Sequence, residues 1–168
     1  GDQSFSVNTG LFMPLFFVSD TALNSANLSF GGVGSLRWNA FLGNQLSVGI
    51  ETSGSISLTR NSAVLFMLPV NGTLSYHIRT IGLGSEIEFP IGLGLGFNIA
   101  RLRDATKVDP VIKPSVGVLF ALDGEWDLGL TAQYWLVPQV YFDPSLTDDN
   151  RLGNFLQIDF TARYRFDL

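Results

Sequence analysis

The only histidine of the chain is the residue with the clearest potential for acid–base chemistry. Ser75 and His77 are two residues apart, so in a strand they would share one face. Glu88 could supply the carboxylate that a serine–histidine–acid triad requires, but nothing in the sequence demands that role. No second histidine is present. We therefore favour the interpretation that Ser75 and His77 are polar side chains that fill the interior of the protein. We expect no enzyme and no catalytic residue.

Other candidate sites also have simpler explanations. Glu86 and Glu88 would lie about 7 Å apart on one strand face, but buried carboxylates more often pair with arginine than act in catalysis. The three aspartates at 143, 148 and 149 lack calcium-loop spacing. The glycines at 92, 94 and 96 precede no helix that would form a phosphate loop. The chain contains no cysteine, which excludes disulfides and thiolate metal sites. We expect no metal site and no cofactor.

The segment 156–168 shows the clearest structural pattern. Apolar or aromatic residues alternate there with polar ones, which predicts a strand with one apolar and one polar face. The apolar positions are Leu156, Ile158, Phe160, Ala162, Tyr164, Phe166 and Leu168.

The same period of two recurs in seven earlier segments. They lie near 5–17, 28–39, 46–58, 66–78, 87–99, 111–122 and 126–134. Short connections at 43–45, 80–84 and 123–125 alternate with longer polar ones at 19–27, 102–109 and 143–154, and only 60–62 is a short exception. We therefore predict an all-β fold: a single domain over 1–168, forming an eight-stranded antiparallel up-and-down transmembrane β-barrel.

The two strand faces indicate that the barrel lies in a membrane. The polar face is mostly small, which suits an eight-stranded interior, whereas the other face is bulky and almost uncharged. Trp38, Tyr76, Trp126 and Tyr164 all fall near one end of their strands, as an aromatic girdle would. A soluble ligand-binding barrel is the alternative. The net charge of −5 argues against a nucleic-acid partner.

The closing strand, with Phe160, Tyr164, Phe166 and Leu168 at alternate positions, resembles that of small eight-stranded outer-membrane proteins. These include the OmpA transmembrane domain, OmpX and OmpW. The resemblance implies a bacterial outer membrane with both termini periplasmic. It also implies a lipid bilayer or lipopolysaccharide as surroundings, and recognition by the barrel-assembly machinery during biogenesis. Such families usually end in phenylalanine, whereas this chain ends in leucine.

The polar face predicts a plug of charged side chains inside the barrel. On the expected register the plug lies in the periplasmic half. Its members are Arg37, Glu51, His77, Glu88 and Arg163.

Above this plug the inward face becomes apolar. The inward residues of the outer half are Phe12, Phe16, Leu65, Met67, Trp135 and Val137. They would form either a cavity for a small hydrophobic molecule, as the resemblance to OmpW suggests, or a packed core. The sequence therefore leaves two functions open: binding or passage of such a molecule, and surface interaction through the extracellular loops. A lipid-modifying enzyme ranks third.

Five prolines fall within predicted strands, and proline cannot donate a hydrogen bond to a neighbouring strand. They are Pro14, Pro69, Pro90, Pro114 and Pro138. We expect them at bulges or near the outer rim, where strand pairing ends.

Overall fold

The computed structural model describes residues 2–19, 22–25, 28–59, 63–82, 85–102, 105–139 and 151–167. The regular elements of these residues are β-strands. They are β1 (Asp2–Ser19), β2 (Ala22–Ser25), β3 (Gly31–Phe41), β4 (Leu46–Leu58), β5 (Val64–Gly82), β6 (Ser85–Leu102), β7 (Ala105–Asp123), β8 (Trp126–Gln139) and β9 (Arg151–Asp167). Within the described residues, no helix is long and apolar enough to cross a bilayer.

Eight of the strands close into an antiparallel barrel. From β3 to β9 each strand pairs with its sequence neighbour, β1 pairs with β3, and β9 returns to pair with β1. β2 pairs only with the last residues of β1, so it extends the end of β1 as a hairpin and adds no strand to the wall. The predicted eight-stranded barrel is confirmed.

Two of the predicted long connections contain more strand than expected. β2 lies inside the predicted loop 19–27. β6 continues to Leu102 and β7 begins at Ala105, with Leu102 opposite Ala105, so most of the predicted loop 102–109 is paired. Pairing uses main-chain groups, and it therefore continues through the polar residues of this hairpin. Of the third predicted connection, 143–150 lies outside the described residues, and the rest belongs to β9.

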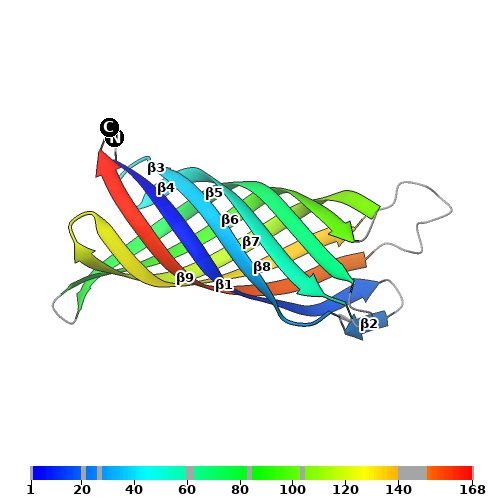
Figure 1. The fold of residues 1–168 in the computed structure, drawn as a ribbon. Coiled ribbons are helices and arrows are strands. Elements are labelled where there is room, and N and C mark those ends of the chain that lie inside the picture. Colours follow the sequence, from blue (N-terminus) through cyan, green and yellow to red (C-terminus); the bar gives the residue numbers. More distant parts are fainter. Residues whose placement is uncertain are drawn as a thin grey trace.

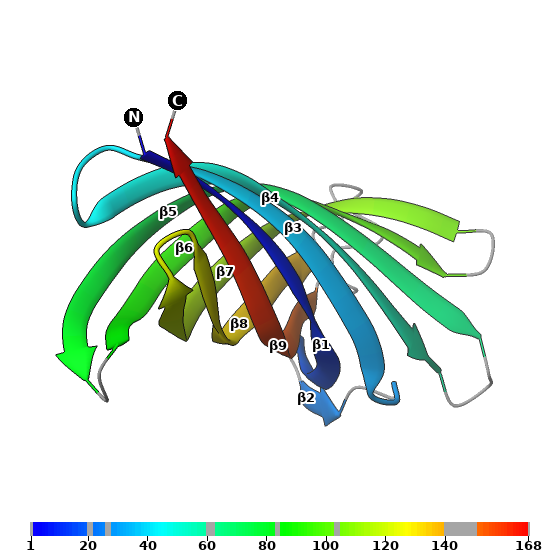
Figure 2. The same cartoon turned by 60° about the vertical axis from the view of Figure 1, so that its left-hand side comes forward.

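The two ends of the barrel differ (Figure 1). Both chain ends lie at one end, together with the connections β3–β4 and β7–β8, and we call this the turn end. The opposite end carries β2 and the β6–β7 hairpin, and we call it the loop end. The strands are strongly tilted in both ribbon views, and the walls at the loop end differ in height (Figure 2).

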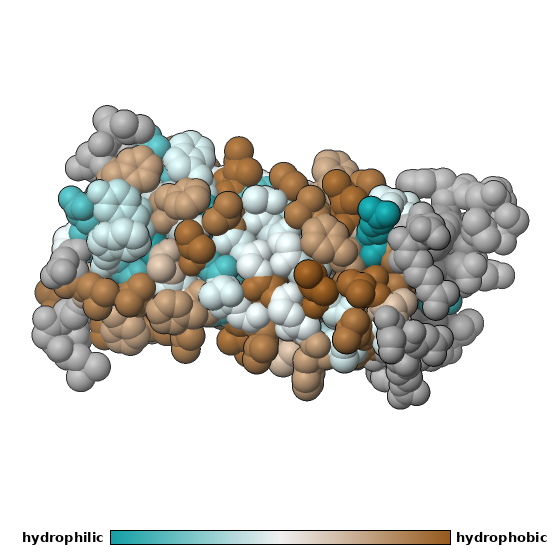
Figure 3. Space-filling model, viewed as in Figure 1, coloured by the Kyte–Doolittle hydropathy of each residue, from teal (hydrophilic) through white to brown (hydrophobic). Residues whose placement is uncertain are grey.

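The outer surface is apolar over most of its height. Along β6 every outward residue from Ile87 to Ile99 is apolar, and Arg101 is the next outward side chain. Brown and pale residues cover the middle of the face seen in Figure 3, whereas teal lies mostly toward the two ends. An apolar band bounded by polar residues is the exterior of a barrel that spans a bilayer.

Aromatic residues with polar contacts lie near the turn end. The indole nitrogen of Trp38 donates to Gln3 at 2.9 Å, and the hydroxyl of Tyr76 donates to Gln45 at 2.7 Å. The rings of Trp126 and Tyr164 are 5.0 Å apart. These four aromatic residues are those predicted to form the girdle.

The prolines coincide with defects in strand pairing. Pro14 adjoins a register shift between β1 and β9, and Pro138 lies one residue from the end of β8. The other three lie farther inside their strands, away from the rim where some were expected. Pro69, Pro90 and Pro114 are each paired with one neighbouring strand and fall in a gap of the pairing with the other. Proline tolerates such a gap because it has no backbone N–H that would need an acceptor on the unpaired side.

Candidate functional site: the barrel interior

A buried network of ion pairs, the lower network, lies inside the barrel near the turn end. It consists of His77, Glu88, Asp127 and Arg163. His77 Nδ1 lies 2.7 Å from Glu88 Oε1, and Arg163 Nη1 donates to the same oxygen. Arg163 Nε donates to Asp127 Oδ2 at 2.7 Å. Asp127 and Arg163 are direct partners in the β8–β9 register, so strand pairing alone brings these two charges together.

The exposed Arg79 and the half-buried Arg165 extend the lower network toward the turn end. Arg79 Nε donates to the second oxygen of Glu88 at 3.2 Å. Arg165 Nη2 donates to the second oxygen of Asp127 at 2.8 Å. Both carboxylates are therefore engaged on both of their oxygens.

His77 also has a serine partner, but not the one suggested by sequence spacing. Ser47 Oγ lies 2.7 Å from His77 Nε2, so Ser47, His77 and Glu88 are connected in the order of a catalytic triad. Ser47 is fully buried, and Glu88 is shared with two arginines. The arrangement lacks an exposed nucleophile, and its contacts are those of a structural network.

A second network, the middle network, surrounds Glu51. Arg37 Nε donates to Glu51 Oε2 at 2.6 Å, and Gln133 donates to the same oxygen at 3.3 Å. Lys113 Nζ binds Glu51 Oε1 and also donates to Ser53 Oγ at 2.9 Å. The four strands β3, β4, β7 and β8 are thus joined across the lumen at one carboxylate.

The structure therefore places all five predicted plug residues inside the barrel, but in two separate networks. Lys113 and Asp127 are central to these networks and were not identified from the sequence. A signal for both was present: Lys113 shares the inward face of β7 with Ser115 and Gly117, and Asp127 alternates with outward Trp126 and Leu128.

Toward the loop end the interior becomes an apolar core. It consists of Phe12, Val33, Met67, Val111, Trp135, Val137 and Phe155, all buried. The Phe12 ring lies 4.9 Å from Trp135 and 5.2 Å from Phe155 between centroids. The indole nitrogen of Trp135 donates to Gln157 at 2.7 Å, so the one polar group of this ring is satisfied.

Four of the six predicted cavity residues lie in this core: Phe12, Met67, Trp135 and Val137. Leu65 packs against its edge, and Phe16 is half-buried. Phe17 packs against the core instead, at 5.8 Å from Phe155. The alternation had placed Phe17 outside. The register shift beside Pro14 changes which residues face inward beyond it, as a bulge does.

Comparison with known proteins shows where this architecture recurs. A protein-family model matches residues 1–164. An uncharacterized protein of Borreliella burgdorferi is 20% identical over 158 residues, which covers 81% of this chain and 73% of that protein. The crystal structure of Neisserial surface protein A (NspA) superposes with a TM-score of 0.70 at 11% identity, over 99% of both chains. That of Ail, the attachment invasion locus protein of Yersinia pestis, gives 0.50 at 14% identity, again over 99% of both.

The chain has the fold of the small eight-stranded outer-membrane β-barrels that these two crystal structures represent. In a barrel of this size the interior is just wide enough to be filled by side chains. Here the lower network, the middle network and the apolar core follow one another between the turn end and the loop end. No group of three or more histidine, aspartate or glutamate side chains in the described part of the chain could hold a metal ion.

Proposed function

We propose that this outer-membrane barrel is closed along its lumen and acts through the surface at its loop end. Both termini then lie in the periplasm, together with the short turns. One observation carries the proposal: the carboxylate of Glu51 joins Arg37, Lys113 and Gln133 across the lumen, directly below the packed aromatic rings. A solute would have to break this buried ion pair and separate the rings in order to pass.

The strand lengths support a surface role. A strand crosses the hydrocarbon layer in about 9–11 residues, whereas β5, β6 and β7 have 19, 18 and 19 residues. The outward apolar row of β6 ends at Ile99, so the β6–β7 hairpin continues beyond the apolar band. Paired strands provide a more rigid surface than the long polar connections expected from the sequence.

The similar proteins point in the same direction. One is named a surface protein and the other an attachment invasion locus protein. We extend to this chain the general role that these names describe, presentation of a binding surface outside the cell. We also propose that outer-leaflet lipid such as lipopolysaccharide surrounds the apolar band. The barrel-assembly machinery would recognise the closing strand β9.

Two experiments test the lumen and the loop end independently. The purified barrel in planar bilayers should show at most small, irregular conductance. Cell adhesion conferred on a non-adherent host bacterium should be lost when residues 103–104 and 140–150 are replaced by Gly-Ser linkers, and kept in Met67→Leu, which changes only the core. Steady conductance comparable to that of a general porin would contradict the proposal. So would a host bacterium that remains non-adherent when it expresses the unmodified protein.

A second function, binding of a small hydrophobic molecule within the loop-end half, is favoured by the gradient of burial there. Phe12 and Trp135 are fully buried, whereas Phe16, Phe17 and Leu65 are only half-buried. Rings that are less tightly packed toward the loop end could separate to admit an alkyl chain. In a protein with Trp38 and Trp126 replaced by phenylalanine, long-chain alkyl ligands should then change the emission of Trp135. An unchanged emission would exclude this function.

A further inference from the structure

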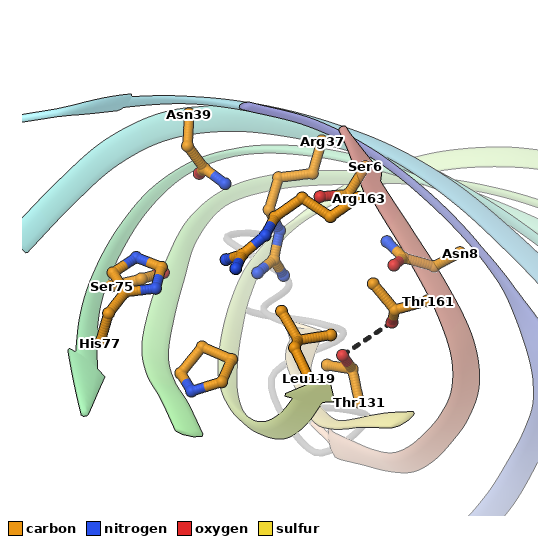
Figure 4. Close-up of a pocket in the computed structure, with 11 residues that line it drawn as sticks. Ser6, Asn8, Arg37, Asn39, Ser75, His77, Leu119, Thr131, Thr161 and Arg163 are labelled. Atoms are coloured by element: carbon orange, nitrogen blue, oxygen red, sulfur yellow. Dashed lines mark hydrogen bonds between the residues drawn. The ribbon is translucent and has the colours of Figure 1, made fainter. Parts of the chain in front are cut away.

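A small cavity lies inside the barrel between the lower and middle networks. Its volume is about 20 Å³, which is room for one water-sized occupant. Arg37 of the middle network and Arg163 of the lower network both contribute to its wall. In Figure 4 the guanidinium groups of both turn into the cavity, with Asn8, Thr131 and Thr161 among the side chains around it.

The wall of this cavity is rich in hydrogen-bond donors and positive charge. Its polar side chains come from arginine, serine, asparagine, threonine and histidine, and none of the eleven described residues that line it is acidic. The carboxylates that neutralise the two arginines lie behind them: Glu51 behind Arg37, and Glu88 and Asp127 behind Arg163. The two guanidinium groups are therefore closer to the cavity than the carboxylates that pair with them.

One donor in this wall has no partner within the described part of the chain. Arg163 donates through Nε to Asp127 and through Nη1 to Glu88, but its Nη2 is buried and has no hydrogen-bond partner there. Arg163 as a whole is only 2% exposed. A buried guanidinium N–H without an acceptor is costly, so the site requires an acceptor of the size of the cavity.

Two occupants have that size: a water molecule and a monoatomic anion. Water both donates and accepts, whereas a halide only accepts. The two guanidinium groups offer donors alone, and the hydroxyl and amide groups of the wall can also donate to an anion. At low dielectric, the attraction between an anion and two nearby cations is large. The geometry favours the anion.

We propose that the cavity between Arg37 and Arg163 is a binding site for a single halide ion, which is chloride under ordinary conditions. The ion accepts a hydrogen bond from Arg163 Nη2 and lies between the two cations. It connects the lower network to the middle network and so strengthens the closure of the lumen. Polyatomic anions such as sulfate do not fit a cavity of this volume.

The first test is anomalous diffraction from crystals grown in bromide. A bromide peak is expected between the guanidinium groups of Arg37 and Arg163. In parallel, the urea midpoint of unfolding is measured in detergent micelles at constant ionic strength, with sodium bromide or chloride exchanged for sodium gluconate. A ligand that binds only the folded state stabilises it in proportion to the logarithm of its concentration when it is in excess, so the midpoint should rise as halide replaces gluconate.

A matched pair of variants links the effect to the cavity. Thr131→Val replaces a hydroxyl of the cavity wall by a methyl group of similar volume and should reduce the halide dependence of the midpoint. Thr9→Val makes the same change on the outward face of β1 and should leave it unchanged. A water molecule in place of the bromide peak, or equal midpoints in halide and gluconate for the unmodified protein, would overturn the proposal even if a variant failed to fold.

Discussion

The ammonium group of Lys113 lies 4.5 Å from the centre of the Trp135 ring. The same group binds Glu51 on its other side. Lys113 thus forms the boundary between the polar and apolar halves of the interior, because it satisfies a buried carboxylate and packs a cation against an aromatic face at once. Lys113 therefore contacts both halves of the barrel interior.

Replacing Lys113 by methionine should destabilise the barrel strongly. The change keeps most of the volume but leaves Glu51 with fewer cations, and breaking a buried ion pair costs about 3–5 kcal/mol. The free energy of unfolding in urea, measured in micelles, would report the loss. Thr106→Met, on the exposed face of the same strand, should change it little. A loss below about 1 kcal/mol for Lys113→Met would show that Arg37 and Gln133 suffice for Glu51.

The cost of an outward charge should depend on its height along β6. Leu93→Arg places arginine in the middle of the apolar row and should cost about 2–4 kcal/mol, whereas Ile99→Arg, at the end of the row next to Arg101, should cost about 0–1 kcal/mol. Folding yield and unfolding free energy in phospholipid bilayers are the measurements. Equal costs at the two positions would contradict the assignment of the apolar band to the bilayer.

Gly96 should not tolerate a side chain, whereas Gly54 should. A Cβ at Gly96 would lie 2.0 Å from the carbonyl oxygen of Val70 on the neighbouring strand, but at Gly54 nothing lies within 4 Å. Gly96→Ala must displace main chain and should cost at least about 1–3 kcal/mol. Gly54→Ala should be neutral or slightly stabilising. The two variants, compared by urea unfolding, test the close approach of β5 and β6, and equal stability would refute it.

Ser47 should not behave as a nucleophile despite its contact with His77. It is fully buried, and Glu88 is held by Arg79 and Arg163. A fluorophosphonate probe should therefore leave Ser47 unmodified, as judged by peptide mass spectrometry. Labelling of Ser47 that disappears in His77→Phe would instead reveal a hydrolase in the barrel.

The barrel itself could be predicted because its signal is local. Alternation along each strand decides which side chains face lipid and which face the lumen, since neighbouring residues of a strand point to opposite sides. The eight barrel strands and the aromatic residues near one end followed from this pattern. Arg37, Glu51, His77, Glu88 and Arg163 were placed on the inward face by the same reasoning.

The pairing of these inward charges was not predictable in this way. Glu51 and Lys113 are 62 residues apart and lie on β4 and β7, which are not neighbours in the sheet. They meet across the lumen because the barrel is closed with a particular stagger of its strands, and no single strand contains that information. Ser47, which replaced Ser75 as the partner of His77, lies opposite Ser75 on the neighbouring strand β4. That contact depends on the register between the two strands, which neither strand contains alone.

The loop-end half depended most on tertiary structure. The shift beside Pro14 brought Phe17 into contact with the core, and main-chain pairing extended β6 and β7 through residues whose side chains carry no strand pattern. Alternation identifies an inward face only while the register is unbroken. Hydrophobic residues indicate a strand only where one of its faces contacts lipid or an apolar core. Beyond those limits the course of the chain is set by hydrogen bonding to the neighbouring strand, which forms only when the barrel closes.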